Sequence, residues 1–191
     1  MILAVANLKG GTGKTTTAVY LARQLSAVVV DADPQGSALG WAEAVAGDGG
    51  TLGIEVVHLP DPKLAGRLPK ADRVVIDCSP RDHRITDAAI TAADLVVIPS
   101  ATTSADMDRT WATLDLAAQL GTTAVVLLVK VRSGTRSLGN AIDAMAAERV
   151  TVLDARIPQR EALAVVWGQP LTTDPYGYDQ ACEQIEELLH A

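Results

Sequence analysis

Phenylalanine is absent from this chain of 191 residues, and aromatic residues together make up 3% of it. The hydrophobic content is nevertheless 48%. The interior therefore has to be built from aliphatic side chains, mainly Val, Leu, Ile and Ala. A chain of this length can bury a substantial core, and we expect one domain over residues 1–191.

Cysteine and long apolar runs are also scarce. Two cysteines, Cys78 and Cys182, do not make a disulfide framework or a metal cluster, which indicates a reducing, cytoplasmic setting. The apolar runs have the length of strands, and no basic and apolar leader precedes the first of them. Neither export nor membrane insertion is expected from this pattern.

Positive charge is in deficit, because the formal net charge is −7. This argues against a uniformly basic nucleic-acid-binding protein, but the charges are unevenly placed. Six Lys and Arg residues lie within positions 130–160, whereas positions 174–191 hold five acids and no Lys or Arg. A contact with a polyanion would therefore have to use a local basic region.

What the chain does contain is a regular alternation of short apolar runs with helical patterns. The expected strands are Ile2–Ala6, Val28–Asp31, Ile54–His58, Arg73–Asp77, Leu95–Ile98, Thr123–Val129 and Thr151–Ala155. The expected helices are Lys14–Leu25, Ser37–Ala46, Ile85–Ala93, Ala105–Leu120, Ser137–Ala147, Glu161–Trp167 and Asp179–Leu189. Several strands are apolar throughout, as is typical of parallel strands buried on both faces. The pattern predicts an α/β fold with a doubly wound, mostly parallel sheet, and ligands outside the carboxyl ends of its strands.

A glycine-rich segment stands between the first expected strand and the first expected helix, and it reads Lys9-Gly10-Gly11-Thr12-Gly13-Lys14-Thr15-Thr16. Strand, loop and helix in this order are the setting of a phosphate-binding loop, the alternative being a plain turn with two solvated lysines. The glycines let backbone N–H groups turn inward around a polyphosphate, and the helix N-terminus adds partial positive charge. Lys14 is expected to reach the β- and γ-phosphates, and the Thr15 hydroxyl to hold Mg²⁺.

This segment departs from the common G-x-x-x-x-G-K-[ST] pattern, because Leu8 stands at the first glycine position and a second lysine, Lys9, follows it. It resembles the deviant Walker A box of the ParA/MinD family of P-loop ATPases. The resemblance implies that the segment binds ATP or ADP with Mg²⁺. It also implies that Lys9 reaches across a dimer interface to the nucleotide of the other subunit, and so acts in catalysis together with Lys14.

Two further segments place carboxylates directly after strands. Asp31 and Asp33 leave the second expected strand, in a segment that resembles the family's second box, where the residue matching Asp33 positions the attacking water. The alternative is a polar turn with a helix cap. Asp77 ends a buried strand in a Walker B-like element and can meet the hydrated Mg²⁺ through a water. Asp33 is a second candidate for the metal.

Two later segments also resemble the family. In residues 93–106, Thr103 and Asp106 match the usual Ser/Thr and Asp positions, although they also fit an ordinary helix N-terminus. Residues 156–170 resemble the segment that packs on the adenine, which implies that Ile157 and Pro158 contact the base.

The resemblance extends from Met1 to about Leu171 and implies a small ParA without an N-terminal helix-turn-helix domain. It implies a nucleoid-associated DNA-partition ATPase that forms a sandwich homodimer on ATP and binds DNA without sequence preference. A ParB-like centromere-binding partner would stimulate hydrolysis. Basic residues that face one side of the dimer would neutralise phosphates. The candidates are Lys130, Arg132, Arg136, Arg149 and Arg160.

Two alternatives use the same fold. A MinD-like positioning ATPase would carry a basic C-terminal helix for anionic lipid, but the last helix here has Glu183, Glu186 and Glu187. A P-loop metabolic synthetase would need an acceptor pocket, for which no convergent residues are found. An iron–sulfur ATPase reductase would need paired cluster cysteines, which Cys78 and Cys182 do not supply.

Overall fold

The fold is that of a computed structural model, which describes residues 1–190. Seven strands form one sheet in the spatial order β3–β2–β4–β1–β5–β6–β7, and all of their pairings are parallel. The strands are β1 Ile2–Val5, β2 Val28–Asp31, β3 Val56–His58, β4 Val74–Asp77, β5 Leu95–Ser100, β6 Ala124–Val131 and β7 Val152–Pro158. The expected doubly wound α/β fold is confirmed, with a sheet that is parallel throughout.

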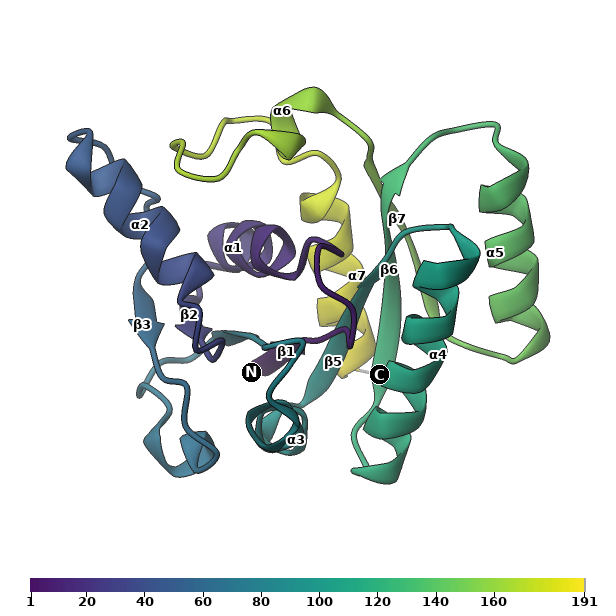
Figure 1. The fold of residues 1–191 in the computed structure, drawn as a ribbon, viewed down its shortest axis with the longest axis horizontal. Helices are drawn as coiled ribbons and strands as arrows, with labels where there is room; N and C mark the ends of the chain where they lie inside the picture. Colours follow the sequence, from purple (N-terminus) through teal and green to yellow (C-terminus); the bar gives the residue numbers. More distant parts are fainter. Residues whose placement is uncertain (191) are drawn as a thin grey trace.

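Helices cover both faces of this sheet (Figure 1). They are α1 Lys14–Leu25, α2 Ser37–Gly47, α3 His83–Ala92, α4 Ser104–Gln119, α5 Arg136–Ala147, the short α6 Glu161–Ala164 and α7 Tyr178–His190. Helices α1, α2 and α7 share one apolar core with the sheet, and α3, α4 and α5 share a second core on the opposite face. Crossover helices on both faces are what a parallel sheet requires.

The strands supply both cores by alternation. Leu3 and Val5 of β1 belong to the core beneath α1, and Ala4 between them belongs to the opposite core. Because both faces are buried, the sequence of β1 is apolar at every position. Aliphatic side chains dominate both cores, as the composition predicts, and Trp41 and Tyr20 are the largest of the fully buried side chains.

The expected boundaries differ from the structure most at β7, which ends at Pro158 rather than Ala155, and at α6. Between β3 and β4 the chain also forms a 3-10 turn, η1 Leu64–Arg67. Helix α6 ends at Ala164 rather than Trp167, because the chain turns away to pack on α2. There the Trp167 indole N–H donates to the carbonyl of Ser37 at 3.0 Å. A tertiary contact of this kind overrides local helical propensity.

The last helix, α7, packs against α1 and β7. Among its apolar side chains, Cys182 and Ile185 are buried, whereas Leu188 is 42% exposed. This helix therefore uses most of its apolar face to cover the core of the domain. Across residues 1–190 the structure has no helix that combines the length and the apolar character needed to cross a membrane.

Candidate functional site

The candidate site lies at the carboxyl edge of the three strands β2, β4 and β1. Asp77 at the end of β4 is in register with Val5 on one side and with Asp31 on the other. The loops that leave these strands therefore converge on one edge. Strand β1 is central, with the later strands β4 and β5 on its two sides, which is the kind of switch point where ligands of parallel sheets bind.

The glycine-rich loop begins directly after β1 and is held in place by Asn7. The Asn7 amide donates to the carbonyl of Pro99 at 3.0 Å, and its side-chain oxygen accepts the backbone N–H of Lys9 at 2.9 Å. Gly11 and Gly13 have φ values of 76° and 88°, which other residues rarely adopt. In the described part of the chain no side chain caps the first turn of α1, so its N–H groups remain available for an anion.

Lys14, at the start of α1, is buried to 7% exposure beside the end of β4. Its ammonium donates to the backbone carbonyl of Lys9 at 2.9 Å, inside the curve of the loop. Burial lowers the pKa of Lys14, against the opposing effect of the nearby Asp77 carboxylate. Within residues 1–190 this buried ammonium has no hydrogen-bonded counter-ion, only a neutral carbonyl, and a phosphate would supply one.

Asp77 is 1% exposed, and neither of its carboxylate oxygens finds a hydrogen-bond donor within residues 1–190. Burial raises its pKa to about 7, and the carboxylates of Asp31 and Asp33 add to the rise. The nearby Thr15 hydroxyl lowers the pKa of Asp77, but it does not form a hydrogen bond with the Asp77 carboxylate. An orphaned buried carboxylate beside a threonine hydroxyl is a donor set that suits Mg²⁺ with part of its water shell.

Asp31 is the last residue of β2 and Asp33 follows two residues later, and the two carboxylates have different surroundings. The Asp31 carboxylate is fully buried and accepts the backbone N–H groups of Ala38 and Leu39 at 2.8 and 2.9 Å. It therefore acts as the helix cap, closing the first turn of α2. Asp33 instead lines an open hollow together with Gly10 of the glycine-rich loop and Arg81.

Lys9 forms an ion pair within its own chain. Its ammonium lies 2.5 Å from the carboxylate of Asp106 on α4, and the Thr103 hydroxyl donates to the other oxygen of that carboxylate. Burial opposes ionisation, but the hydrogen bonds from Lys9 and Thr103 hold the pKa of Asp106 below its ordinary value. Thr103 is also the N-cap of α4 and accepts the N–H of Asp106. The expected helix N-terminus is therefore present, and Asp106 in its first turn also holds Lys9.

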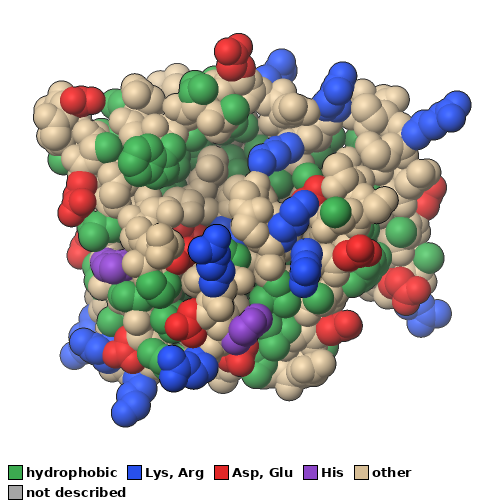
Figure 2. All heavy atoms as spheres, in the orientation of Figure 1, with side chains coloured by type: hydrophobic (Ala, Val, Ile, Leu, Met, Phe, Trp, Pro, Cys, Tyr) green, Lys and Arg blue, Asp and Glu red, His purple; other side chains and the backbone are tan. Residues whose placement is uncertain are grey.

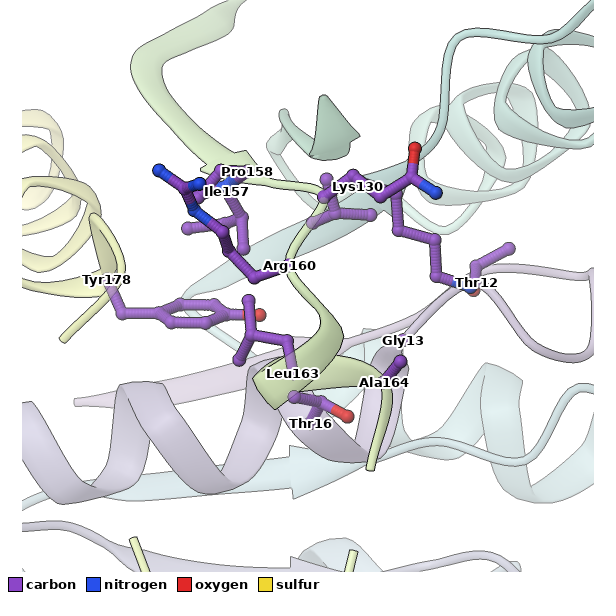
Figure 3. Close-up of a pocket in the computed structure, with 12 residues that line it drawn as sticks. Thr12, Gly13, Thr16, Lys130, Ile157, Pro158, Arg160, Leu163, Ala164 and Tyr178 are labelled. Atoms are coloured by element: carbon purple, nitrogen blue, oxygen red, sulfur yellow. The ribbon is translucent and has the colours of Figure 1, made fainter. Parts of the chain in front are cut away.

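A cleft of about 230 Å³ opens beside the start of α1 (Figure 3). Its apolar lining includes Val129 from the end of β6, Ile157 and Pro158 from β7, and Leu163 from α6. The volume is below the roughly 300–1,000 Å³ of complete small-molecule sites, so it suits one part of a ligand. The two residues expected at the base, Ile157 and Pro158, lie in this lining, next to Thr12 and Gly13 of the loop.

Tyr178 is a lining residue that the sequence analysis missed. It opens α7, stacks on Tyr20 of α1 with ring centroids 4.9 Å apart, and its hydroxyl lies 3.1 Å from that of Thr17. Figure 3 shows its ring lying toward the cleft from the side opposite Lys130. Tyr178 lies 161 residues from Thr17 in the sequence, so no local motif connects the two. The only signal in the sequence was the low aromatic content of 3%, because a rare tyrosine is a candidate for a specific contact.

The structure does not bring all five basic candidates together. Lys130, Arg132 and Arg160 lie at the carboxyl edge, where they line the cavities beside the loop, and Arg136 begins α5 there. Arg149 follows the end of α5, which runs back to the opposite edge. Figure 2 shows Lys and Arg side chains from the upper right, near the start of α5, to the centre of the visible face.

Comparison with known proteins identifies the family of the chain. A family model described as the CobQ/CobB/MinD/ParA nucleotide binding domain matches residues 3–170. A maintenance of carboxysome distribution protein A from Gloeobacter kilaueensis is 39% identical over 172 residues, covering 84% of this chain and 74% of that protein. The chromosome partitioning protein ParA of Caulobacter vibrioides is 29% identical over 146 residues, 51% of this chain and 55% of that protein. The chain spans little more than half the length of the latter.

Solved structures show the same fold. A plasmid partition protein from Borrelia burgdorferi, bound to the ATP analogue AMPPNP, superposes with a TM-score of 0.80 over 98% of each chain at 18% identity. At this level of identity the likeness is one of fold.

Proposed function

The chain belongs to the CobQ/CobB/MinD/ParA nucleotide-binding family, and from this premise we propose that it is an Mg²⁺-dependent ATPase that converts ATP and water to ADP and phosphate. The proposed unit is one P-loop ATPase domain over residues 1–191. One observation carries the proposal: the uncapped glycine loop, the buried Lys14 and the orphaned Asp77 carboxylate meet at a single edge of the sheet.

In this proposal the polyphosphate lies in the curve of the loop from Gly10 to Gly13, against the free N–H groups at the start of α1. Thr12, Thr15 and Thr16 lie within or directly after the same curve. Lys14 exchanges the carbonyl of Lys9, which it contacts at 2.9 Å, for the β- and γ-phosphate oxygens. The adenine enters the adjoining cleft and rests on Ile157 and Pro158.

The metal site in this proposal is formed by Thr15, which ligates directly, and Asp77, which binds through a water. When bound, Mg²⁺ neutralises charge on the β- and γ-phosphate oxygens. Asp77 gains hydrogen-bond donors for its two orphaned oxygens. Asp33 lines the hollow beside Gly10 and orients the attacking water there, and it is also the second candidate for the metal.

We assign Lys9 to the partner's nucleotide in a sandwich homodimer that forms on ATP. Within one chain its ammonium is held 2.5 Å from Asp106, so it does not stabilise its own bound phosphates. The triphosphate of a second copy offers more negative charge than one carboxylate. Exchange of Asp106 for that triphosphate would couple nucleotide state to dimerisation.

DNA is the proposed surface on which the dimer acts. Arg132, Arg136 and Arg160 lie on the carboxyl edge of an otherwise acidic protein. A local cationic patch binds phosphates without reading sequence, and its affinity falls steeply with salt. Arg149 is separated from this group by the length of α5.

The proposed cargo is a DNA molecule to be partitioned, a plasmid or a chromosome, with a ParB-like centromere-binding protein as the stimulating partner. The likeness to the chromosome partitioning protein ParA of Caulobacter vibrioides supports it. A second candidate is the distribution of a carboxysome-like body, which the 39% identity to a carboxysome distribution protein favours. Both candidates use the same ATP switch and differ in the partner that stimulates hydrolysis.

The test is phosphate release by the purified chain with ATP and Mg²⁺, with and without DNA, beside a Lys14→Ala variant. The proposal expects slow, Mg²⁺-dependent hydrolysis that Lys14→Ala abolishes, together with DNA binding in ATP but not in ADP. Hydrolysis that responds to a small metabolite and ignores DNA would instead indicate a synthetase.

A further inference from the structure

Lys130 occupies an unusual place in the backbone of β6. Between Leu128 and Val131 the strand carries one residue more than β7 does between the paired Arg156 and Pro158, which is a β-bulge. Lys130 sits in this bulge with φ of 54°, in the left-handed region that non-glycine residues avoid. Bulges and left-handed residues beside a site commonly re-aim a side chain toward it.

The Lys130 side chain extends from this bulge to the glycine-rich loop. The Lys130 ammonium donates to the backbone carbonyl of Gly11 at 2.7 Å, across 119 residues of sequence. Figure 3 shows the side chain running from the end of β6 toward Thr12. An ammonium on a carbonyl is a charge-assisted hydrogen bond, which is stronger than a neutral one.

Lys130 also stands between two cavities. It lines the apolar cleft together with Val129 and Ile157, and it lines the polar hollow that contains Lys9 and Gly10. Its methylene stem therefore belongs to the wall of the cleft while its charged end lies on the loop. Long lysine side chains often combine the two environments in this manner.

We propose that Lys130 positions the bound nucleotide and does not contact DNA. Its ammonium holds the Gly11 stretch of the loop in the curve that accepts phosphate, and its stem forms one wall of the cleft for the base and ribose. The inference rests on the proposed function in that the ligand is ADP or ATP. It removes Lys130 from the set of DNA-contacting candidates.

The experiment measures binding of fluorescent ADP and ATP analogues to the purified full chain in the absence of DNA. Lys130→Met keeps the stem and loses the charge, and it is expected to weaken binding of both nucleotides about tenfold. Lys130→Arg, which can still donate to Gly11, is expected to recover most of that loss. Lys70→Met is the matched control, because it makes the same change at an exposed lysine to which no site is assigned and should leave nucleotide affinity unchanged.

Kinetics and a second variant separate positioning from general destabilisation. Lys130→Met should raise KM for ATP about tenfold and leave kcat at saturating ATP within about twofold. Lys130→Gly relieves the left-handed backbone and removes the side chain, so it should lose nucleotide affinity like Lys130→Met while melting no lower than the wild-type protein.

Two results would overturn the inference. One is wild-type nucleotide affinity in Lys130→Met. The other is a loss of DNA binding in Lys130→Met at saturating ATP, with a shallower dependence on salt, which would return Lys130 to the DNA surface. A wild-type chain that binds neither nucleotide would instead refute the proposed ATPase function, so the two failures are distinguishable.

Discussion

Neutralising Asp77 is expected to stabilise the nucleotide-free protein while abolishing its Mg²⁺-dependent activity. The carboxylate is 1% exposed with no hydrogen-bond donor for either oxygen within residues 1–190. Burial raises its pKa from 3.8 to about 7. Each pKa unit corresponds to about 1.4 kcal/mol. Above the folded-state pKa, keeping Asp77 ionised therefore costs about 4 kcal/mol as an upper bound.

Asparagine has nearly the same shape and no charge. Its own unpaired amide costs about 1–3 kcal/mol, so Asp77→Asn should be about 1–3 kcal/mol more stable than wild type at about pH 8.5. Protonation offsets this advantage of the variant, because the raised folded-state pKa of Asp77 makes folding favour the protonated acid. Wild type therefore gains on the variant as pH falls through 7, by about 2 kcal/mol at about pH 5.5.

The assay is urea unfolding of both proteins in EDTA without nucleotide, at the two pH values. Asp33→Asn is the matched control, since Asp33 lies at the same edge but is partly exposed and keeps its contact with the Gln35 N–H. The reasoning would be refuted if Asp77→Asn were less stable than wild type at the higher pH, or if the difference between them did not change with pH.

Three further predictions follow from the same edge of the sheet. Asp106→Asn removes the ion-pair partner of Lys9, so light scattering should show dimers at an ATP concentration about three- to tenfold lower than for the wild type. An unchanged ATP concentration at half-dimerisation would mean that the ion pair does not restrain Lys9. The double variant Arg132→Met, Arg136→Met should reduce the slope of log K for DNA binding against log salt concentration by about two, with ATP affinity unchanged. A DNA affinity equal to that of the wild type would show that neither residue contacts DNA. Asp31→Ala removes the acceptor for the first turn of α2, so its free energy of unfolding in urea should fall by about 1–2 kcal/mol. Asp33→Ala should lose ATPase activity with little change in the free energy of unfolding. The opposite result for the two variants would contradict these roles.

The fold and the carboxyl-edge motifs were predictable from local sequence. Continuous apolar runs predicted parallel strands, and the order strand, glycine loop and helix predicted the loop around Gly11 and Gly13, whose positive φ values agree. Asp77 was placed by its position at the end of a buried run. These features depend on short stretches of chain, where spacing determines geometry.

What the sequence did not reveal depends on contacts between distant segments. The direction of the Lys130 side chain depends on a bulge in the pairing of β6 with β7. The spacing of apolar residues in the sequence does not predict such a bulge. Tyr178 reaches the cleft only because α7 returns to pack on α1. Trp167 leaves its expected helix for a carbonyl 130 residues away. In each case a tertiary contact determined the outcome, and local patterning carried no information about it.

The central claim is that ATP converts monomers into a DNA-binding dimer through Lys9. The most direct measurement is the mass of the protein in solution, by light scattering, in ATP with Mg²⁺, in ADP and without nucleotide, for the wild type and for Lys9→Ala. We expect dimers of the wild type in ATP alone, and monomers of Lys9→Ala in every condition. Dimers of Lys9→Ala in ATP, or a wild type that stays monomeric, would contradict it.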